Sequence, residues 1–321
     1  MRLSYRWAAA SLLVLTGIIS GCNRNHRKVV AVIPKGNADL FWQTVHAGAV
    51  KASREHNIEI VWDGPPNETD ISTELQILET MINRHVDAIA LAPSDREALV
   101  NTVNRAASEG MPVVIYDSAI ATDKYVSFIS TDNFAAGEMA GERMGEILHG
   151  KGNIIMVKTT PGGASTTARE EGFKKVITGK FPGIHIVDER FGKAVVATSL
   201  DVTENMLTAH PNVDGIFCSN ESGTNGAIQA LRSRGAKVKI VGFDWSPTTL
   251  AALGAGQIDS LVIQNPFQMG YEAVTACVKA INKQPVQKQI NLNPRLITQQ
   301  NLNDPDVQQQ VKPDLKQYLG G

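Results

Sequence analysis

Val29-Val30-Ala31-Val32-Ile33 is an uninterrupted apolar run of strand length, and it is the stretch that decides the fold. A strand buried on both faces of a parallel sheet shows such a run instead of alternating apolar and polar residues. A helix is predicted next, because Phe41, Val45, Ala49 and Ala52 recur on one stripe. The run and the stripe together predict a βα unit.

The same alternation continues through the first half of the chain. Apolar runs at 58–62, 86–91 and 112–115 predict further strands. Between the first two runs, Ile71, Leu75, Leu78 and Ile82 predict a helix. Strands that alternate with helices form parallel sheets, so the sequence predicts an α/β protein.

The second half of the chain repeats the first. Val86-Asp87-Ala88-Ile89 corresponds to Val213-Asp214-Gly215-Ile216, and Tyr116-Asp117 corresponds to Phe243-Asp244, at the same offset. The length of 321 residues suffices for two cores of common domain size. The repeat therefore predicts two similar, Rossmann-like lobes with parallel sheets flanked by helices.

Charge and cysteine content exclude several functions. The 31 basic and 32 acidic residues are scattered, so no basic patch for nucleic acid or for an acidic lipid surface is expected. Cys22, Cys218 and Cys277 form no C-x-x-C pair, and none has a histidine at ligand spacing. We therefore expect no metal site and no cofactor.

The N-terminal segment predicts export. Arg2 and Arg6 precede an apolar run at 7–19, which is too short to span a bilayer but typical of a signal peptide. The run ends in Ile19-Ser20-Gly21-Cys22, which resembles a lipobox. This resemblance implies a lipoprotein signal peptide over 1–21, lipidation of the Cys22 thiol and a tether over 22–28. The alternative is an ordinary signal peptide followed by an incidental cysteine.

Polar and aromatic residues gather where the predicted strands end. They are Lys35, Asp39, Phe41 and Trp42 after the first strand, Asp117 and Ser118 after the fourth, and Asn220, Asp244 and Gln264 in the second half. Ligands of open parallel sheets bind beyond the carboxyl ends of the strands. Carboxylates accept hydrogen bonds from hydroxyls, amides donate them, and flat aromatic rings cover C–H faces. The set therefore predicts a neutral, hydroxyl-rich ligand such as a monosaccharide.

Four segments carry a resemblance to a known family. They are Thr131-Asp132-Asn133, Arg169-Glu170-Glu171-Gly172-Phe173, Val241-Gly242-Phe243-Asp244 and Gln264-Asn265-Pro266-Phe267-Gln268-Met269-Gly270. In this order, over about residues 28–300, the chain resembles the ribose-binding (type I) periplasmic binding proteins of ABC transporters. The resemblance implies two hinge-connected lobes that close on a ligand, with crossings near residues 131, 264 and 295.

The resemblance also implies where the lobes divide and which residues bind. The N-terminal lobe would comprise 29–131 plus 265–295, and the C-terminal lobe and tail 132–264 plus 296–321. Phe41 and Trp42 would stack on the sugar, and Phe191 would form a second aromatic wall. The resemblance implies ligand contacts for Phe41, Trp42, Asp117, Arg169, Phe191, Asn220, Asp244 and Gln264, and the pattern at the strand ends adds Lys35, Asp39 and Ser118.

Departures from the ribose pattern bear on the ligand. Lys35, Asp39, Ala92 and Ser118 differ from the residues that are usual in ribose-binding proteins. These differences favour another pentose, a hexose or a polyol. The polar segment Asp304 to Leu319 predicts a helical tail that straps across the second lobe.

The function classes separate on motifs. The chain has no G-x-S-x-G, P-loop or G-x-G-x-x-G motif, so we expect no enzyme. A repressor of this architecture would need a helix-turn-helix headpiece of roughly 60 residues before the first strand. We predict a monomeric, extracytoplasmic solute-binding protein of an ABC importer, anchored only by its lipid in the periplasm or at the cell surface, with a monosaccharide and the permease as partners. A sugar or autoinducer-2 receptor that feeds chemotaxis or a sensor kinase is the alternative.

Overall fold

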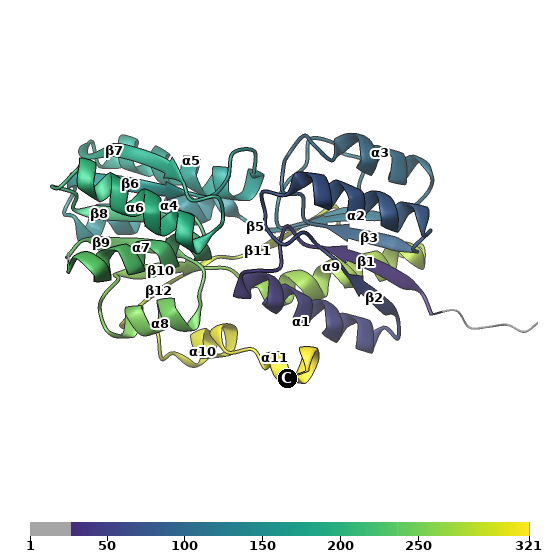
Figure 1. Ribbon diagram of the computed structural model, residues 1–321. Coiled ribbons are helices and arrows are strands. Elements are labelled where there is room, and N and C mark those ends of the chain that lie inside the picture. The colour runs from purple at the N-terminus through teal and green to yellow at the C-terminus, as the bar shows by residue number, and fades with distance from the viewer. Residues whose placement is uncertain (1–26, 236, 321) are drawn as a thin grey trace, which may run out of the picture.

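A computed structural model describes residues 27–235 and 237–320. The predicted signal peptide, Cys22 and most of the tether lie outside these residues. The chain forms two lobes that lie side by side, each with one central sheet covered by helices (Figure 1). The α/β fold class with two similar lobes is therefore confirmed. Within the described ranges, no helix has the length and apolar character to cross a membrane.

The first lobe holds a six-stranded sheet in the order β11-β5-β4-β3-β1-β2, in which all the strands are parallel. Its elements are β1 (Val29–Ile33), α1 (Leu40–Glu55), β2 (Glu59–Trp62), α2 (Ile71–Asn83), β3 (Ala88–Leu91), α3 (Val100–Ser108), β4 (Val113–Tyr116), β5 (Ser127–Thr131), α9 (Pro266–Ile281) and β11 (Gln289–Leu292).

The apolar run that predicts the first strand forms β1 and serves both faces of the sheet. Val30 and Val32 pack in a core with α1 and α9, whereas Ala31 and Ile33 pack in another core with α2 and α3. Side chains alternate between the two faces of a strand, so a strand covered on both sides needs apolar residues throughout.

The second lobe repeats this arrangement in the order β12-β10-β9-β8-β6-β7. Each strand occupies the place of its counterpart in the first sheet, except that edge strand β12 pairs antiparallel with β10. Its elements are α4 (Asn133–Ile147), β6 (Lys151–Lys158), α5 (Ala164–Lys180), β7 (Gly183–Phe191), α6 (Val196–Ala209), β8 (Gly215–Cys218), α7 (Glu221–Arg234), β9 (Lys239–Phe243), α8 (Pro247–Gly254), β10 (Ser260–Ile263), β12 (Arg295–Thr298) and α10 (Pro305–Val311).

Three crossings join the lobes. The chain passes from β5 into α4, from β10 into α9 and from β11 into β12. Arg295, which the predicted boundary gives to the first lobe, pairs with Ile263 in the second sheet, because β12 begins there. A single crossing could act as a loose linker, but three side by side confine the lobes to a hinge motion.

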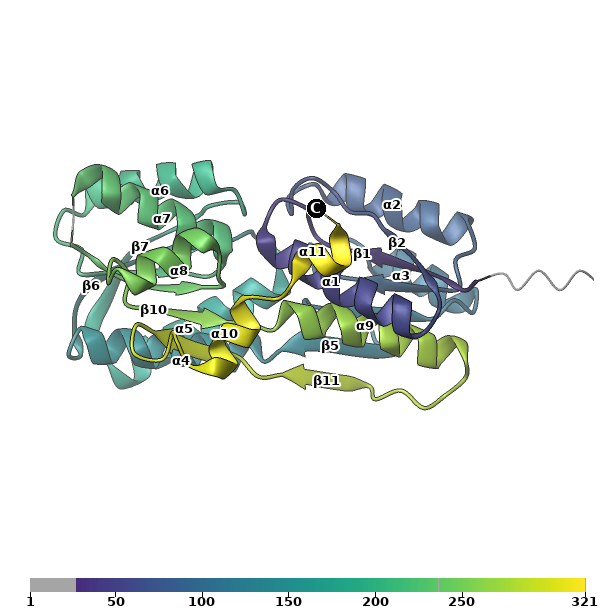
Figure 2. The same cartoon turned by 90° about the horizontal axis from the view of Figure 1, so that it is seen from below.

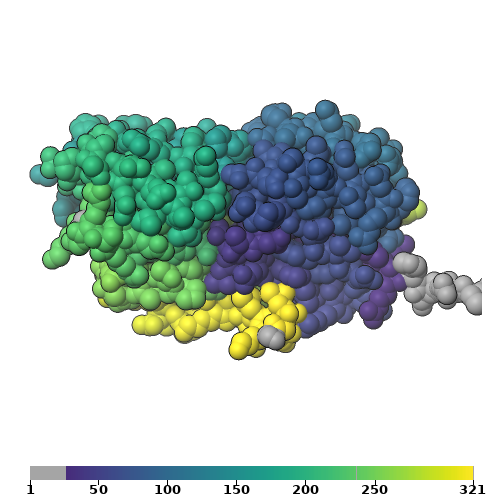
Figure 3. Space-filling model, viewed as in Figure 1, coloured from purple at the N-terminus to yellow at the C-terminus, as the bar shows by residue number. Residues whose placement is uncertain are grey.

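The C-terminal tail divides between the lobes, unlike the strap across the second lobe that the sequence predicts. Val307 and Val311 of α10 are buried in a core of the second lobe. The last helix, α11 (Leu315–Leu319), instead lies against α1 of the first lobe, where the Arg54 guanidinium donates to the carbonyl oxygens of Gln317 and Tyr318 at 2.9 and 3.0 Å. Figure 2, a view from below, shows the tail running across both lobes, and Figure 3 shows it spanning their boundary at the surface.

Candidate functional site

Asp117 and Asp244 directly follow equivalent strands, β4 and β9, of the two lobes. Each has left-handed backbone, with φ of 62° at both positions. The N–H of each donates to the next strand, Asp117 to Ile129 at 2.8 Å and Asp244 to Val262 at 3.0 Å. Few residues other than glycine tolerate this conformation, and aspartate is one of them. The same turn places both residues in the wall of one interlobe cleft.

The cleft is small and draws its walls from both lobes. The empty space between its walls is about 310 Å³, which includes space open to solvent. The lining residues are Lys35, Asp39, Phe41, Trp42, Glu68 and Asp117 from the first lobe, and Ser165, Thr166, Arg169, Asn220, Glu221, Asp244 and Gln264 from the second lobe and its hinge.

Lys35 and Asp117 form a buried ion pair on the first-lobe side. The Lys35 ammonium lies 2.6 Å from the Asp117 carboxylate and donates to the hydroxyl of Ser118 at 2.6 Å. It also donates at 3.0 Å to the hydroxyl of Ser165 in the second lobe, which in turn donates to Asp117 at 3.3 Å. The two contacts of Ser165 cross between the lobes, so they form only in the closed arrangement.

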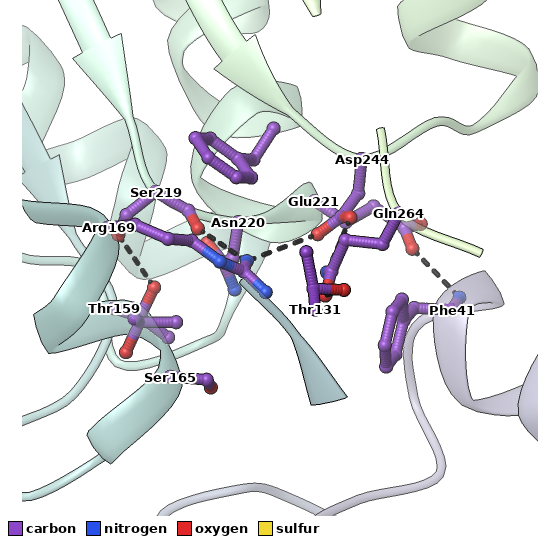
Figure 4. Close-up of polar contacts among 12 residues, drawn as sticks. Phe41, Thr131, Thr159, Ser165, Arg169, Ser219, Asn220, Glu221, Asp244 and Gln264 are labelled. Atoms are coloured by element: carbon purple, nitrogen blue, oxygen red, sulfur yellow. Dashed lines mark hydrogen bonds and ion pairs between the residues drawn. The ribbon is translucent and has the colours of Figure 1, made fainter. Parts of the chain in front are cut away.

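Arg169 holds the opposite side of the cleft. It is 2% exposed, and its guanidinium donates to the Asn133 side chain at 2.8 Å and to the Ser219 carbonyl at 2.9 Å. It also lies 3.7 Å from Asp244 (Figure 4). Its guanidinium carbon stacks over the Phe243 ring, 4.7 Å from the ring centroid. With its partners on both sides, the guanidinium is fixed in place with part of its edge toward the cleft.

Gln264 connects the hinge to this group. Its amide donates to Asp244 at 2.9 Å and its carbonyl oxygen accepts from the Thr131 hydroxyl at 2.9 Å. Thr131 ends β5 and Gln264 follows β10, so this bond links two of the three crossings. The orientation of Asp244 is therefore tied to the geometry of the hinge.

Glu221 reaches across the cleft to the N-terminus of α1. Its carboxylate accepts hydrogen bonds from the N–H groups of Phe41 at 3.0 Å and Leu40 at 3.4 Å (Figure 4). Asp39 stands at the N-cap position of α1, but its side chain makes no capping bond. The free N–H groups of the first turn are thus satisfied from the other lobe.

Phe41 and Trp42 form the aromatic wall of the cleft. Their rings meet edge to face at 4.9 Å, and the Trp42 indole N–H donates to the Glu68 carboxylate at 2.9 Å. Trp42 is 3% exposed and packs against Tyr116. Both rings belong to a first-lobe core and also line the cleft, so they serve packing and the site together.

Burial and mutual repulsion act on the carboxyl groups of the cleft. Burial raises the pKa of Glu221 to about 7, and the nearby Asp244 and Glu68 add to the effect. Burial raises the pKa of Asp39 well above its ordinary value, with further contributions from Glu221 and Glu68. Burial also raises the pKa of Glu68 and Asp244, although Lys35 and Arg169 respectively oppose it. The closed cleft therefore favours protonated or charge-compensated carboxyls.

Most of the predicted ligand-binding residues line the cleft, and two of them, Ser118 and Phe191, do not. Ser118 is fully buried behind it, where its hydroxyl supports Lys35 and Ser165. Phe191 lies at the end of β7 with its ring 4.5 Å from the Lys158 ammonium, outside the cleft lining. The aromatic wall predicted at Phe191 is not part of this cleft lining, and β7, which ends at Phe191, is the outermost strand of its sheet.

Asn220 lines the cleft, and its side chain also caps the N-terminus of α7. Its side-chain oxygen accepts from the N–H of Gly223 at 2.9 Å and so caps α7. Its amide nitrogen donates to the Ser222 hydroxyl at 2.8 Å. The capping role that strand-end polar residues commonly play is therefore present here.

The sequence prediction missed Glu68, Ser165, Thr166 and Glu221. Signals for them exist in the chain. Glu221 follows Asn220 directly, and Ser165 precedes Arg169 by one helical turn. Glu68 stands in the loop after β2, and loops at the carboxyl ends of strands form such sites.

A larger hollow lies in the second lobe, but its position makes it a weaker candidate for the ligand-binding site. Its lining includes Arg232, Lys239 and Gln257, and every lining residue belongs to the second lobe. Arg143 in its wall is already bound at two points by Asp259, at 2.7 and 3.1 Å. Closure of the lobes cannot act on a hollow in one lobe. Among the described residues, no group of histidine, cysteine, aspartate and glutamate could hold a metal ion.

Comparison with known proteins agrees with this geometry. A family model described as a periplasmic binding protein domain matches residues 30–285. The ribose import binding protein RbsB of Haemophilus influenzae is 27% identical over 292 residues, which cover 91% of this chain and 98% of that protein.

Two solved structures share the fold over most of their length. A carbohydrate transporter solute-binding protein from Agrobacterium radiobacter, in complex with D-arabinose, has a TM-score of 0.87 and 28% identity and covers 89% of this chain and 99% of its own. An ABC transporter solute-binding protein from Agrobacterium vitis with bound D-fucose has a TM-score of 0.86 and 33% identity, with coverage of 88% and 100%.

Proposed function

Because the chain belongs to the family of periplasmic binding proteins, we propose that it is the sugar-binding receptor of an ABC importer. Members of this family act outside the cytoplasm. They are transport components and not enzymes. The observation that carries the proposal is the cleft, where Asp117 and Asp244 enter from equivalent strand ends of two lobes. The sugars bound by the similar structures from Agrobacterium support the same ligand class.

The residues of the cleft suit hydroxyl groups. Asp244 and Asp117 can each accept from adjacent hydroxyls, and the Arg169 guanidinium and the Lys35 ammonium can donate to oxygens. The Phe41 and Trp42 rings can cover an apolar C–H face. Gln264 holds Asp244 from the hinge and adds an amide to the same wall.

Binding and closure are coupled in this mechanism. The first lobe presents Asp117 and Lys35, and the second presents Arg169 and Asp244. A ligand that bonds both sets gains its full interaction only when the lobes close, so it shifts the equilibrium toward the closed form. The importer's permease then recognises that form, as in other members of the family.

The anchor and the assembly state belong to the same proposal. Ile19-Ser20-Gly21-Cys22 supports cleavage before Cys22 and attachment of lipid to its thiol. The protein would then work as a membrane-anchored monomer. Mass spectrometry of the mature protein tests this, because an unmodified N-terminus or cleavage elsewhere contradicts it.

A ligand screen tests the function. Thermal-shift measurements of the purified protein against pentoses, hexoses, polyols and autoinducer-2 should give a melting temperature that rises with ligand concentration, since a ligand that binds only the folded state stabilises it. Small-angle scattering should show that the same ligand keeps the lobes closed. The absence of any response to hydroxyl-rich compounds would count against the proposal.

A further inference from the structure

The charges that line the cleft do not balance. Its carboxylates outnumber its cations five to two, and the groups are Asp39, Glu68, Asp117, Glu221 and Asp244 against Lys35 and Arg169. Both cations already have a carboxylate partner, Lys35 at 2.6 Å from Asp117 and Arg169 at 3.7 Å from Asp244. Among the described residues, no cation forms an ion pair with the other three carboxylates, although Lys35 and Arg169 lower the pKa of Glu68 from a greater distance.

The hydrogen bonds of these three carboxylates come from neutral groups. Glu68 accepts from the Trp42 indole N–H at 2.9 Å, and Glu221 accepts from two N–H groups at the start of α1. The end of a helix supplies roughly half a positive charge. Asp39 accepts no capping bond from its own helix. These neutral donors and the N-terminus of α1 therefore offset much less than the three negative charges of Asp39, Glu68 and Glu221.

Closure of the lobes increases the free-energy cost of the excess negative charge in the cleft. Asp39 and Glu68 belong to the first lobe and Glu221 to the second, so closing the lobes brings like charges together in a space with little water. Such proximity raises the free energy of the charged forms. The raised pKa values of all three carboxyls follow from the same arrangement. A closed, loaded cleft therefore either takes up protons on these carboxyls or accommodates additional positive charge from the ligand.

The aromatic wall stands beside this acidic group. Phe41 and Trp42 stand in the first turn of α1, two and three residues after Asp39, and the Trp42 indole N–H donates to Glu68. No lining residue from the described part of the second lobe is aromatic. A sugar ring sandwiched between two aromatic side chains is therefore not what this cleft provides. Aromatic faces with neighbouring carboxylates attract a ligand cation.

On the basis of the proposed function, we propose that the ligand is an amino sugar or an aminated polyol, whose protonated amine lies among Asp39, Glu68 and Glu221. Its hydroxyl groups would bond Arg169, Asp244 and Lys35, as in the mechanism above. The ammonium would neutralise one charge and donate up to three hydrogen bonds, which matches three acceptors from both lobes. Recognition of the amine is thus tied to closure.

Isothermal titration with matched ligands tests the inference. The probes are D-glucosamine, D-galactosamine and D-mannosamine, each beside its neutral parent hexose and its N-acetyl derivative. The amine should bind at least tenfold more tightly than the parent, and N-acetylation should remove this advantage because it removes the charge. Titration in two buffers of different ionisation enthalpy reports any protons taken up.

Two variants locate the effect. Asp39→Asn should reduce the advantage of the amine over its parent severalfold, since Asp39 has no capping bond to lose. Asp63→Asn, the same charge change at an exposed first-lobe position outside the cleft lining, should leave the advantage unchanged.

The outcomes separate the two proposals. Neutral hexoses, pentoses or polyols that bind as tightly as the amines, with or without proton uptake, would overturn the inference and leave the sugar receptor in place. An unchanged amine advantage in Asp39→Asn would also overturn it. If neither amines nor neutral compounds bind, the proposed function fails as well.

Discussion

Asp117 and Asp244 show how single residues carry the site. Both stand where a strand ends, and both take a left-handed backbone conformation that costs free energy in most residues other than glycine. The conformation is kept in both lobes, although glycine would adopt it at lower cost. A carboxylate at this turn, and not the turn alone, is therefore what the two lobes share.

Asp244→Asn should weaken ligand binding at least tenfold. The substitution removes the charged acceptor and leaves Arg169 without its ion pair, and a charged hydrogen bond contributes about 1.5–3 kcal/mol. Isothermal titration measures the effect with whichever ligand the screen identifies. Asp259→Asn, which changes a carboxylate of the same lobe outside the cleft, is the matched control. Equal affinities for the Asp244 variant and the wild type would exclude Asp244 from binding.

Glu74→Gln should make the stability of the first lobe less sensitive to pH. Glu74 is fully buried in α2, accepts from the Ser94 N–H, and burial raises its pKa to about 7. A raised pKa means that its contribution is fully present below the unfolded value of 4.5 and is lost as pH rises through about 7.

Urea denaturation at pH 5 and pH 8 measures this effect. The wild type should lose up to about 3 kcal/mol more than Glu74→Gln over that interval, because the glutamine oxygen keeps the Ser94 bond without a titrating group. Glu79→Gln, on the exposed side of the same helix, should behave as the wild type does. If the wild type and Glu74→Gln lose the same free energy of unfolding between pH 5 and pH 8, Glu74 is not the group that causes the pH dependence.

At the scale of elements, a pair of glycines brings two helices together in each lobe. In the first lobe, a Cβ at Gly48 or Gly270 would lie 1.9 or 2.0 Å from a carbonyl oxygen of the partner helix, at the contact of α1 and α9. In the second lobe, Gly137 and Gly172 do the same for α4 and α5, with 2.0 and 2.2 Å. The close contacts fix α1 and α5, which carry cleft residues of opposite lobes.

Two glycines of α5 give a matched test of this packing. Gly172→Ala should lower the free energy of unfolding by about 1–3 kcal/mol, because its methyl group meets the Phe134 carbonyl. It should also weaken binding severalfold, since Arg169 lies one turn away. Gly179→Ala faces open space and should raise stability by about 0.5–1 kcal/mol without affecting binding. Chemical denaturation measures the stability of both variants, and calorimetric titration measures their ligand affinity. A Gly172→Ala variant with unchanged stability would contradict the close packing of α4 and α5.

Capping of α1 also depends on an element of the other lobe. The Glu221 carboxylate at the start of α7 accepts from the first N–H groups of α1, whereas Asp39, in the capping position, does not. The N-terminus of α1 is therefore completed by closure. This arrangement gives the closed form a contact that does not depend on the ligand.

At the scale of the whole molecule, the tail is a second connection between the lobes besides the hinge. Its α10 is buried in the second lobe, and the Gln310 side chain donates to the Gln264 carbonyl at the hinge at 2.7 Å. Its α11 is held on the first lobe by Arg54, and the Tyr318 ring lies 5.4 Å from Phe267. Opening of the lobes has to displace one of these contacts.

A chain that ends at Val311 should populate the open form more. The truncation keeps α10 in its core and removes only the contacts with α1 and Phe267. We expect a larger radius of gyration without ligand, by small-angle scattering, and a severalfold lower ligand affinity. Arg54→Ala should reproduce part of the effect with the tail present. A truncated chain with unchanged scattering and affinity would show that the tail does not restrain the lobes.

The sequence by itself determined the local structure and the repeat. The apolar run 29–33 became β1, and the stripe that includes Phe41 and Val45 became the buried side of α1. Hydrophobic periodicity reports these elements because each strand and helix must bury its own apolar face. The constant offset between the halves already indicates that Asp117 and Asp244 are equivalent.

Only the tertiary structure decided which residues meet across the cleft. Glu221 caps a helix of the other lobe, Ser165 bonds Lys35 and Asp117, and Phe191 lies on an outer strand away from the site. The tail contacts both lobes instead of one. These facts depend on how the two lobes dock. Periodicity along the chain carries no information on distances between elements that are far apart in sequence.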